Sequence, residues 1–229
     1  MAGRALPPSS PFAADDGAPD PALAAAAEGW ATDPGMLTEL VSALGRARVL
    51  VPVVTGADDR AADRSTAVVA LPTADGRTGL PVFSGVASLA AWHPEARPVP
   101  VPGARAAAAA LAEGWELLVL DPAGPVTVVV PGPAVRAMAG GYPWEPAVSD
   151  GVVRPEVAEA IRRAASGGDV RAVRVEPGRS AEVAVVLEVR PGLGRAALDA
   201  LLGVVTRRLA AEEVVAWRVD SLEIRVAPG

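Results

Sequence analysis

A glycine-rich turn near the C-terminal end has the residue spacing most suggestive of chemistry in this chain. Gly192, Gly194 and Ala197 follow an apolar run with the spacing G-x-G-x-x-A, and a helical pattern begins directly after them. In dinucleotide-binding folds such glycines allow a tight bend, and the helix N-terminus holds the pyrophosphate. Asp220 offers the acidic group that would contact the ribose. The pattern therefore admits a small-molecule or nucleotide-binding enzyme that uses Gly192 and Gly194.

Two features favour a simple strand-to-helix connection at this turn. Only nine residues follow Asp220, fewer than the remaining strands of a doubly wound sheet require. The two apolar runs before the turn are separated by the short polar segment 176–180, which is typical of an antiparallel pair. A single motif of this kind is weak. We therefore expect that the glycines serve the turn and that the following helix packs on a sheet.

The residue types needed for most other enzyme chemistry are missing or scattered. The chain has no Cys and no Lys, which excludes thiolate nucleophiles, Schiff bases and the phosphate-binding lysine of a P-loop. Its one histidine, His93, stands at a predicted helix end, where a solvated side chain is expected. Asp58, Asp59 and Asp63 alternate with arginines and lack the order of a calcium-binding loop. We expect no catalytic residues, no metal and no cofactor, so the protein is not predicted to be an enzyme.

The composition restricts the partners and the compartment. The net charge is −6 with a pI near 4.9, so binding of nucleic acid is disfavoured, although a local arginine patch stays compatible with it. No apolar run has the length of a membrane span, and the N-terminus lacks the apolar region of a secretion signal. Apolar residues make up 51% and aromatic residues only 3%, which predicts an aliphatic core. We expect a cytoplasmic protein.

The N-terminal part divides into a tail and a first domain. Residues 1–33 are rich in Ala, Pro, Asp and Gly without apolar periodicity, and are predicted to be a disordered tail, apart from a short helix that ends near Trp30. Residues 34–140 are predicted to form the domain. Its first expected elements are a helix whose apolar face is Leu37, Leu40, Val41 and Leu44, a strand at 48–54, and a hairpin at 66–84 that turns at Asp75-Gly76-Arg77. A short helix capped by Ser84 and ending at Trp92, and an extended piece at 98–103, are expected next. The domain is then expected to continue with an alanine-rich helix to Glu113, two strands around Asp121–Gly124 and a helix at 133–139.

A linker and a second domain follow. Residues 141–151 have no period and several turn-forming residues, so they are predicted to be the linker. Residues 152–229 show a helix at 154–166, two strands, a helix at 194–211 and a last strand, the order α-β-β-α-β. The predicted fold class is α+β, with two small mixed domains and largely antiparallel sheets after a disordered tail.

Aromatic residues mark the candidate binding surface. The five tryptophans lie at segment edges or in the linker, where a large aromatic side chain either closes a core or anchors a partner. Of the five, Trp144 in the linker is the one expected to be most exposed. The hairpin turn and the helix after it give a second candidate surface, made of Asp75, Arg77, Phe83 and Trp92.

Three separated pieces of the first domain resemble the SseB family. They are "LVSALGRARVLVPVV", "DGRTGLPVFSGVASLAAW" and "ELLVLDPAGPVTVVV", in the family's order across residues 35–140. Residues 152–226 resemble the second domain of longer members. The resemblance implies a bacterial protein without established catalytic residues. We therefore expect a non-enzymatic interaction or regulatory module that binds an unidentified protein partner. Association of two copies is compatible with this function, and RNA or ribosome association is a weaker alternative.

Overall fold

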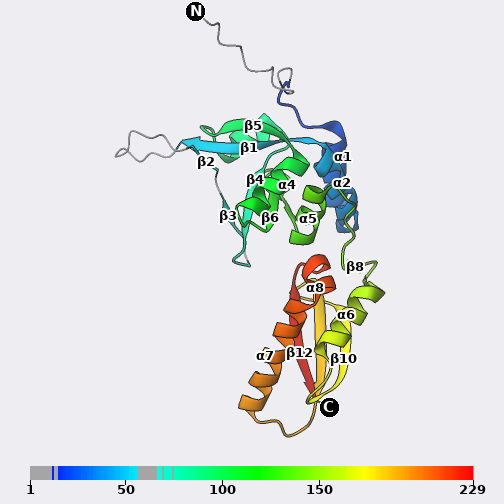
Figure 1. The fold of residues 1–229 in the computed structure, drawn as a ribbon. Helices are drawn as coiled ribbons and strands as arrows, with labels where there is room; N and C mark the ends of the chain where they lie inside the picture. Colours follow the sequence, from blue (N-terminus) through cyan, green and yellow to red (C-terminus); the bar gives the residue numbers. More distant parts are fainter. Residues whose placement is uncertain (1–11, 13–14, 56–65, 69, 74, 229) are drawn as a thin grey trace, which may run out of the picture. The chain divides into compact units, whose positions relative to one another are not determined.

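The chain folds into two compact units. The structure, a computed structural model, describes residues 12, 15–55, 66–68, 70–73 and 75–228 (Figure 1). The first unit comprises Met1–Val130 with Met138–Gly141, and the second comprises Pro131–Ala137 with Tyr142–Gly229. Helices and strands occur in both units, and most strand pairs are antiparallel. The predicted α+β class is therefore confirmed.

Two small sheets form the frame of the first unit. One has the strand order β2-β1-β5, with both pairs antiparallel, and the other has the order β3-β4-β6-β7, in which β4 and β6 run parallel. A backbone bridge between Leu50 and Phe83 joins β1 to the end of β4. The strands are β1 (Arg48–Thr55), β2 (Thr66–Val68), β3 (Leu71–Pro72), β4 (Thr78–Val82), β5 (Arg97–Pro102), β6 (Leu117–Leu120) and β7 (Val128–Val130).

Helices cover these sheets. Leu40, Val41 and Leu44 of α2 are buried, as their helical spacing predicts. In α4 the buried residues are small, since Gly103, Ala106, Ala107 and Ala110 form its inner face. The helical elements are α1 (Pro21–Thr32), the 3-10 turn η1 (Pro34–Met36), α2 (Leu37–Arg46), α3 (Val86–Trp92) and α4 (Gly103–Ala112). The helix α5 (Gly132–Gly140) is divided between the two units after Ala137.

The structure differs from the predicted tail over residues 15–33. Asp20 caps α1, because its carboxylate accepts hydrogen bonds from the N–H groups of Ala22 (2.9 Å) and Leu23 (3.1 Å). Leu23 is fully buried, and α1 packs beside α2. One apolar anchor among alanines gives too little periodicity to be recognised in the sequence. The tail prediction for residues 1–11 and 13–14 lies outside the described residues.

The second unit is a three-stranded sheet with helices on one face. β11 is central, antiparallel to β10 and parallel to β12. Val183, Val185 and Leu187 of β11 are fully buried in a core that also takes in Val157, Ile161, Val205 and Leu209 of the helices. The elements are β8 (Val148–Ser149), β9 (Val152–Val153), α6 (Pro155–Ala165), β10 (Val170–Pro177), β11 (Val183–Val189), α7 (Arg195–Ala211), α8 (Glu213–Arg218) and β12 (Leu222–Pro228).

The unit boundaries differ from the predicted domain limits in two places. Residues 131–137, predicted to end the first domain, belong to the second unit. Hydrogen bonds explain this, since the N–H of Gly132 donates to the Asp220 carboxylate (3.0 Å) and Arg136 donates to the carbonyl of Ala216 (2.9 Å). The predicted linker 141–151 also belongs mainly to the second unit, because β8 pairs with β9.

Candidate functional site

Of the predicted surface residues, Phe83 belongs in the core. Its side chain is fully buried together with Leu50, Leu89 and Ala96. Trp92 is half-buried, with its ring 5.3 Å from the Phe83 ring. Ser84, predicted to cap the helix, is buried as well, and that prediction is wrong, since Gly85 is the N-cap of α3 and no described side chain caps the helix. Phe83 is thus removed from the candidate surface, because it directly follows β4 and its backbone bridges to Leu50 of β1, which holds its side chain in the core.

The hairpin turn itself is satisfied by its own residues. The Thr73 hydroxyl donates to the Asp75 carboxylate (2.5 Å), and Arg77 forms an ion pair with the same group (2.6 Å). The Thr73 hydrogen bond, followed by those from Arg77, lowers the pKa of Asp75 from 3.8 to about 2. Asp75 is exposed and Arg77 half-buried. These polar groups stabilise the turn locally, and their role in partner binding stays a prediction.

Ser84 and Asp121 form a polar contact that sequence patterns did not indicate. The two residues follow the parallel strands β4 and β6, whose carboxyl ends meet at one edge of the sheet. Ser84 donates its hydroxyl to the Asp121 carboxylate (2.6 Å) and its backbone N–H to the other carboxylate oxygen (2.9 Å). Arg48 donates to the Ser84 carbonyl (2.8 Å). A Ser–Asp pair without a histidine between them is no nucleophilic triad, so the contact fastens two strand ends.

The glycine turn lies between β11 and α7. Gly192 has φ +83°, and Gly194 is the N-cap of α7 with φ −69°. A Cβ at either position would meet no atom within 4 Å. The left-handed backbone at position 192 therefore requires a glycine. At position 194 neither the backbone conformation nor close packing requires one. Within the described part of the chain, neither position thus shows the close approach for which a pyrophosphate-binding loop needs its glycines.

Alanine substitutions distinguish the two glycines. We expect Gly192→Ala to lower the free energy of unfolding by about 1–2 kcal/mol, because a side chain is strained at positive φ. Gly194→Ala is expected to change it by no more than about 0.5 kcal/mol, since the helix-cap and unfolded-state effects oppose each other. Urea unfolding followed by circular dichroism measures both, and equal effects would contradict this account of the turn.

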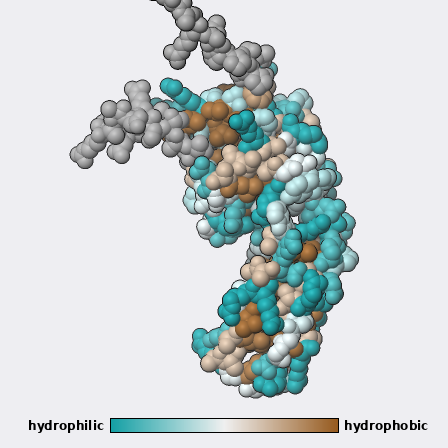
Figure 2. All heavy atoms as spheres, in the orientation of Figure 1, coloured by the Kyte–Doolittle hydropathy of each residue, from teal (hydrophilic) through white to brown (hydrophobic). Residues whose placement is uncertain are grey.

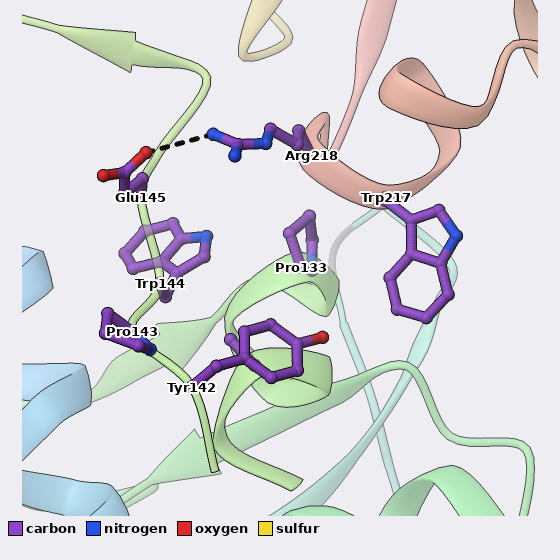
Figure 3. A pocket seen from close by; sticks show the side chains of 8 residues that line it. Pro133, Tyr142, Pro143, Trp144, Glu145, Trp217 and Arg218 are labelled. Atoms are coloured by element: carbon purple, nitrogen blue, oxygen red, sulfur yellow. Dashed lines mark hydrogen bonds and ion pairs between the residues drawn. The ribbon is translucent and has the colours of Figure 1, made fainter. Parts of the chain in front are cut away.

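The strongest candidate site is an aromatic pocket in the second unit (Figure 3). It has a volume of about 140 Å³. Three aromatic side chains and two prolines supply most of its wall, and one acid and one arginine stand at its edge. Its lining residues are Pro133, Ala137, Tyr142, Pro143, Trp144, Glu145, Trp217 and Arg218. We call this set the aromatic pocket.

Its first wall, at the start of α5, is held against α8. The Asp220 carboxylate accepts from the N–H of Gly132, which precedes Pro133. Arg136 donates to the carbonyl of Ala216 (2.9 Å) and lies 5.7 Å from the centre of the Trp217 ring. A guanidinium at this distance from an indole face adds a cation–π attraction. These contacts orient Trp217 beside the pocket.

Its second wall is the segment Tyr142–Glu145, whose continuation is held by two side chains. Arg154 donates through Nε to the Pro146 carbonyl (2.9 Å). Glu182 accepts at one oxygen from the N–H of Ala147 (3.0 Å) and at the other from the N–H of Asp220 (2.7 Å). Burial raises the pKa of the Glu182 carboxyl above its ordinary 4.5, although these N–H donors work in the opposite direction. One carboxyl thus connects the chain just after Glu145 with the chain just after Arg218.

Charged groups at the pocket edge neutralise one another. Arg218 donates to Glu145 (3.1 Å), the pair drawn in Figure 3, and to Glu156 (3.5 Å). Arg154 lies 3.6 Å from the Glu145 carboxylate as well. Arg154 and Arg218 are therefore each already paired with a carboxylate, which disfavours the capture of a phosphate by these two arginines.

Trp144 is the residue for which sequence reasoning failed most clearly. It was expected to be exposed in a linker, but it is only 9% exposed. Its indole Nε1 is buried and has no hydrogen-bond acceptor among the described residues. Figure 3 shows this nitrogen on the side of the ring that faces Pro133 and Arg218 across the pocket. Tyr142 and Trp217 are 48% and 53% exposed, so the opening is aromatic too.

The first unit is similar in sequence to a known protein family. Residues 20–137 match the family model of the SseB protein N-terminal domain. The chain belongs to the SseB family. No curated protein and no solved structure matches the chain. The similarity of residues 152–226 to a second domain of SseB proteins stays a prediction.

The SseB match begins and ends at informative places. It starts at Asp20, the cap of α1, so this helix is part of the SseB domain and not of a tail. It ends at Ala137, within α5, and so includes the first wall of the aromatic pocket but none of its other residues.

Within the described ranges, no helix is long and apolar enough to cross a bilayer, and no group of three or more potential metal ligands is present.

Proposed function

We propose that this SseB-family protein is a non-enzymatic interaction module whose aromatic pocket holds an extended segment of a protein partner. The segment would insert a proline or a small aliphatic side chain, and one of its carbonyls would accept the indole N–H of Trp144. The observation that carries the proposal is this buried donor without an acceptor, on the wall of an aromatic pocket. A buried donor without an acceptor destabilises the protein by about 1–3 kcal/mol, and an acceptor on a bound partner removes this cost.

The size and lining of the pocket support a peptide as occupant. Pockets for small molecules and cofactors enclose about 300–1,000 Å³, whereas this one has about 140 Å³. That volume fits one side chain, but not a nucleotide. Flat aromatic faces beside prolines also suit extended proline-containing segments, which bring little conformational entropy to be lost.

The charge at the pocket edge supports a protein over a nucleic acid. Arg218 is already paired with two carboxylates, and the chain as a whole has a net charge of −6. Binding through phosphate contacts would weaken steeply with added salt. Binding through aromatic contacts is expected to be nearly independent of salt. A cytoplasmic location of the protein stays a prediction.

An oligoproline peptide tests the pocket directly. We expect titration of the ¹⁵N-labelled chain to shift the indole N–H resonance of Trp144, which Trp144→Phe identifies by its loss. Tyr142→Ala and Trp217→Ala are each expected to weaken the affinity about tenfold or more, because exposed aromatic residues provide most of the binding energy at such sites. Trp144→Phe should weaken binding as well, since it keeps an apolar ring but loses the donor.

Controls separate the pocket from other surfaces. Trp30→Phe changes a tryptophan of α1 in the first unit, and should leave the affinity unchanged. Peptide binding that survives both Tyr142→Ala and Trp217→Ala, or no shift of any indole resonance, would contradict the proposal. A thermal shift with NAD that disappears in Gly192→Val would favour the glycine turn and an enzymatic role.

A further inference from the structure

The second sheet has an open edge at β12. In the sheet order β10-β11-β12, β12 pairs with β11 on one side, and no described strand pairs with its other side. The Ser221 carbonyl accepts from the N–H of Val183 in β11 (3.2 Å). Because backbone groups alternate along a strand, Leu222, Ile224 and Val226 direct their N–H and C=O groups toward the open edge. An open edge of this kind is a template for another strand.

The side chains of β12 divide into an apolar and a charged set. Leu222 and Ile224 pack against the core on the helix face, and Val226 is 41% exposed. Glu223 and Arg225 lie on the opposite face. Beside the edge, a hollow of about 270 Å³ opens between α7, α8 and β12, lined mainly by apolar residues that include Leu209, Val215, Val219, Leu222 and Ile224. In Figure 2 apolar residues reach the surface in this part of the second unit, among hydrophilic ones.

The charges of β12 are complementary to β12 itself. If a second copy lies antiparallel with Ile224 opposite Ile224, then Glu223 faces Arg225 of the second copy, and Arg225 faces its Glu223. Leu222 then faces Val226. A twofold axis centred instead on Glu223 or on Arg225 would place like charges opposite each other, which is unfavourable in a sheet. Of the three registers centred on Glu223, Ile224 and Arg225, charge thus favours the one centred on Ile224.

The same register also satisfies the backbone. With Ile224 at the centre, Leu222, Ile224 and Val226 all fall at the hydrogen-bonded positions of the antiparallel ladder, and these are the residues whose groups face the open edge. Glu223 is ionised over a wide pH range. A hydrogen bond from Ser180, followed by one from the backbone of Arg179, lowers its pKa from 4.5 to about 2. Glu223 therefore carries its charge at neutral and mildly acid pH. Within one chain Arg225 already pairs with Glu176 (2.9 Å) and with Glu223, so the cross-strand ion pairs would extend this existing network of charges.

We propose that two copies of this chain associate through β12, antiparallel about a twofold axis at Ile224, so that two three-stranded sheets become one of six strands. The contact is isologous, as in most homodimers. It lies on β12 and the hollow next to it, and uses none of the residues of the aromatic pocket. The proposed dimer therefore does not depend on the proposed peptide binding.

Charge reversal tests the register with the full-length chain. Sedimentation velocity is expected to show a dimer for the wild type at about 10–100 µM. Glu223→Arg and Arg225→Glu each create two like-charge pairs, so each is expected to weaken association at least about tenfold. When these two variants are mixed, every pair becomes Arg opposite Glu, and they are expected to form a heterodimer with wild-type affinity. The double variant Glu223→Arg/Arg225→Glu should also dimerise.

The mixing experiment separates the interface from misfolding, because two misfolded chains do not restore each other. Arg174→Glu in β10 is the control, since it reverses a charge on the same face at the opposite edge of the sheet. It should leave the dimer intact. Val226→Lys at the exposed end of β12 gives a second test and should dissociate it. A wild-type monomer at all concentrations, or single variants that dimerise unchanged, or mixed variants that stay monomeric, would each overturn the proposal.

Discussion

Replacing Gly103 by alanine is expected to prevent the first unit from folding stably. Gly103 begins α4, and its N–H donates to the Ala47 carbonyl (2.8 Å) at the end of α2. A Cβ there would lie 1.9 Å from the Leu44 carbonyl oxygen and 2.9 Å from its carbon, both backbone atoms. The helices α2 and α4 would have to separate. We expect a loss of about 3 kcal/mol or more in the free energy of unfolding.

The neighbouring glycine of the same contact provides the control. A Cβ at Gly45 in α2 would meet only the Met138 side chain, at an ordinary 3.6 Å. Gly45→Ala is therefore expected to stabilise the helix by about 0.5–1 kcal/mol. Urea unfolding followed by far-ultraviolet circular dichroism compares the two variants. Equal midpoints for Gly103→Ala and Gly45→Ala would show that α2 and α4 do not approach as closely as the structure has them.

Removing the Glu182 carboxyl is expected to have the second largest effect. Glu182→Ala leaves the N–H groups of Ala147 and Asp220 without their acceptor, and so should lower stability by about 2–4 kcal/mol. The segment that precedes Ala147 carries Trp144, so the aromatic pocket should lose oligoproline affinity as well. Glu159→Ala removes an exposed carboxylate of α6 that pairs with Arg162 on the same helix, and should cost no more than about 0.5 kcal/mol. Equal losses in the two variants would contradict the role of Glu182.

The contribution of Glu182 to the stability of the fold changes with pH in a direction that its pKa determines. The folded state raises the pKa of Glu182, so the folded chain holds this proton more tightly than the unfolded chain. Its contribution to stability is therefore greatest below the unfolded pKa, and is lost as the pH rises through the folded pKa. Glu182→Gln lacks this titration. The stability of the wild type relative to Glu182→Gln should thus fall as the pH rises from the ordinary carboxyl pKa of 4.5 through the raised folded pKa, and a rise over that range would refute the assignment.

Sequence patterns predicted the elements whose partners are close in the chain. The spacing of Leu40, Val41 and Leu44 was enough for α2, because a helix shows its buried face within three turns. The order helix, two strands, helix, strand of the second unit was also predicted, although the short β9 before α6 and the short α8 after α7 were not. Such features depend on local periodicity and need no knowledge of the tertiary fold.

The aromatic pocket escaped prediction because its residues come from two parts of the chain, 133–145 and 217–218, that lie far apart in the sequence. Trp144 stands among Pro and Gly residues that are typical of a linker, and nothing near it in sequence shows that Glu182 and Arg154 hold the segment in place. Phe83 was assigned to a surface because it follows a turn, while its burial depends on the bridge to Leu50. The aromatic composition drew attention to Trp144, but only the tertiary fold shows the direction in which its indole points.

The chain passes between the two units more than once, which determines how the protein can be dissected. Residues 131–137 belong to the second unit, yet Met138–Gly141 returns to the first. A cut after Val130 therefore takes Met138–Gly141 away from the first unit. A cut after Ala137, where the family match ends, also takes 131–137 away from Asp220 and Ala216. No single cleavage gives two intact pieces, so a recombinant fragment of the SseB domain has to extend to Gly141 and will carry part of the pocket wall exposed to water.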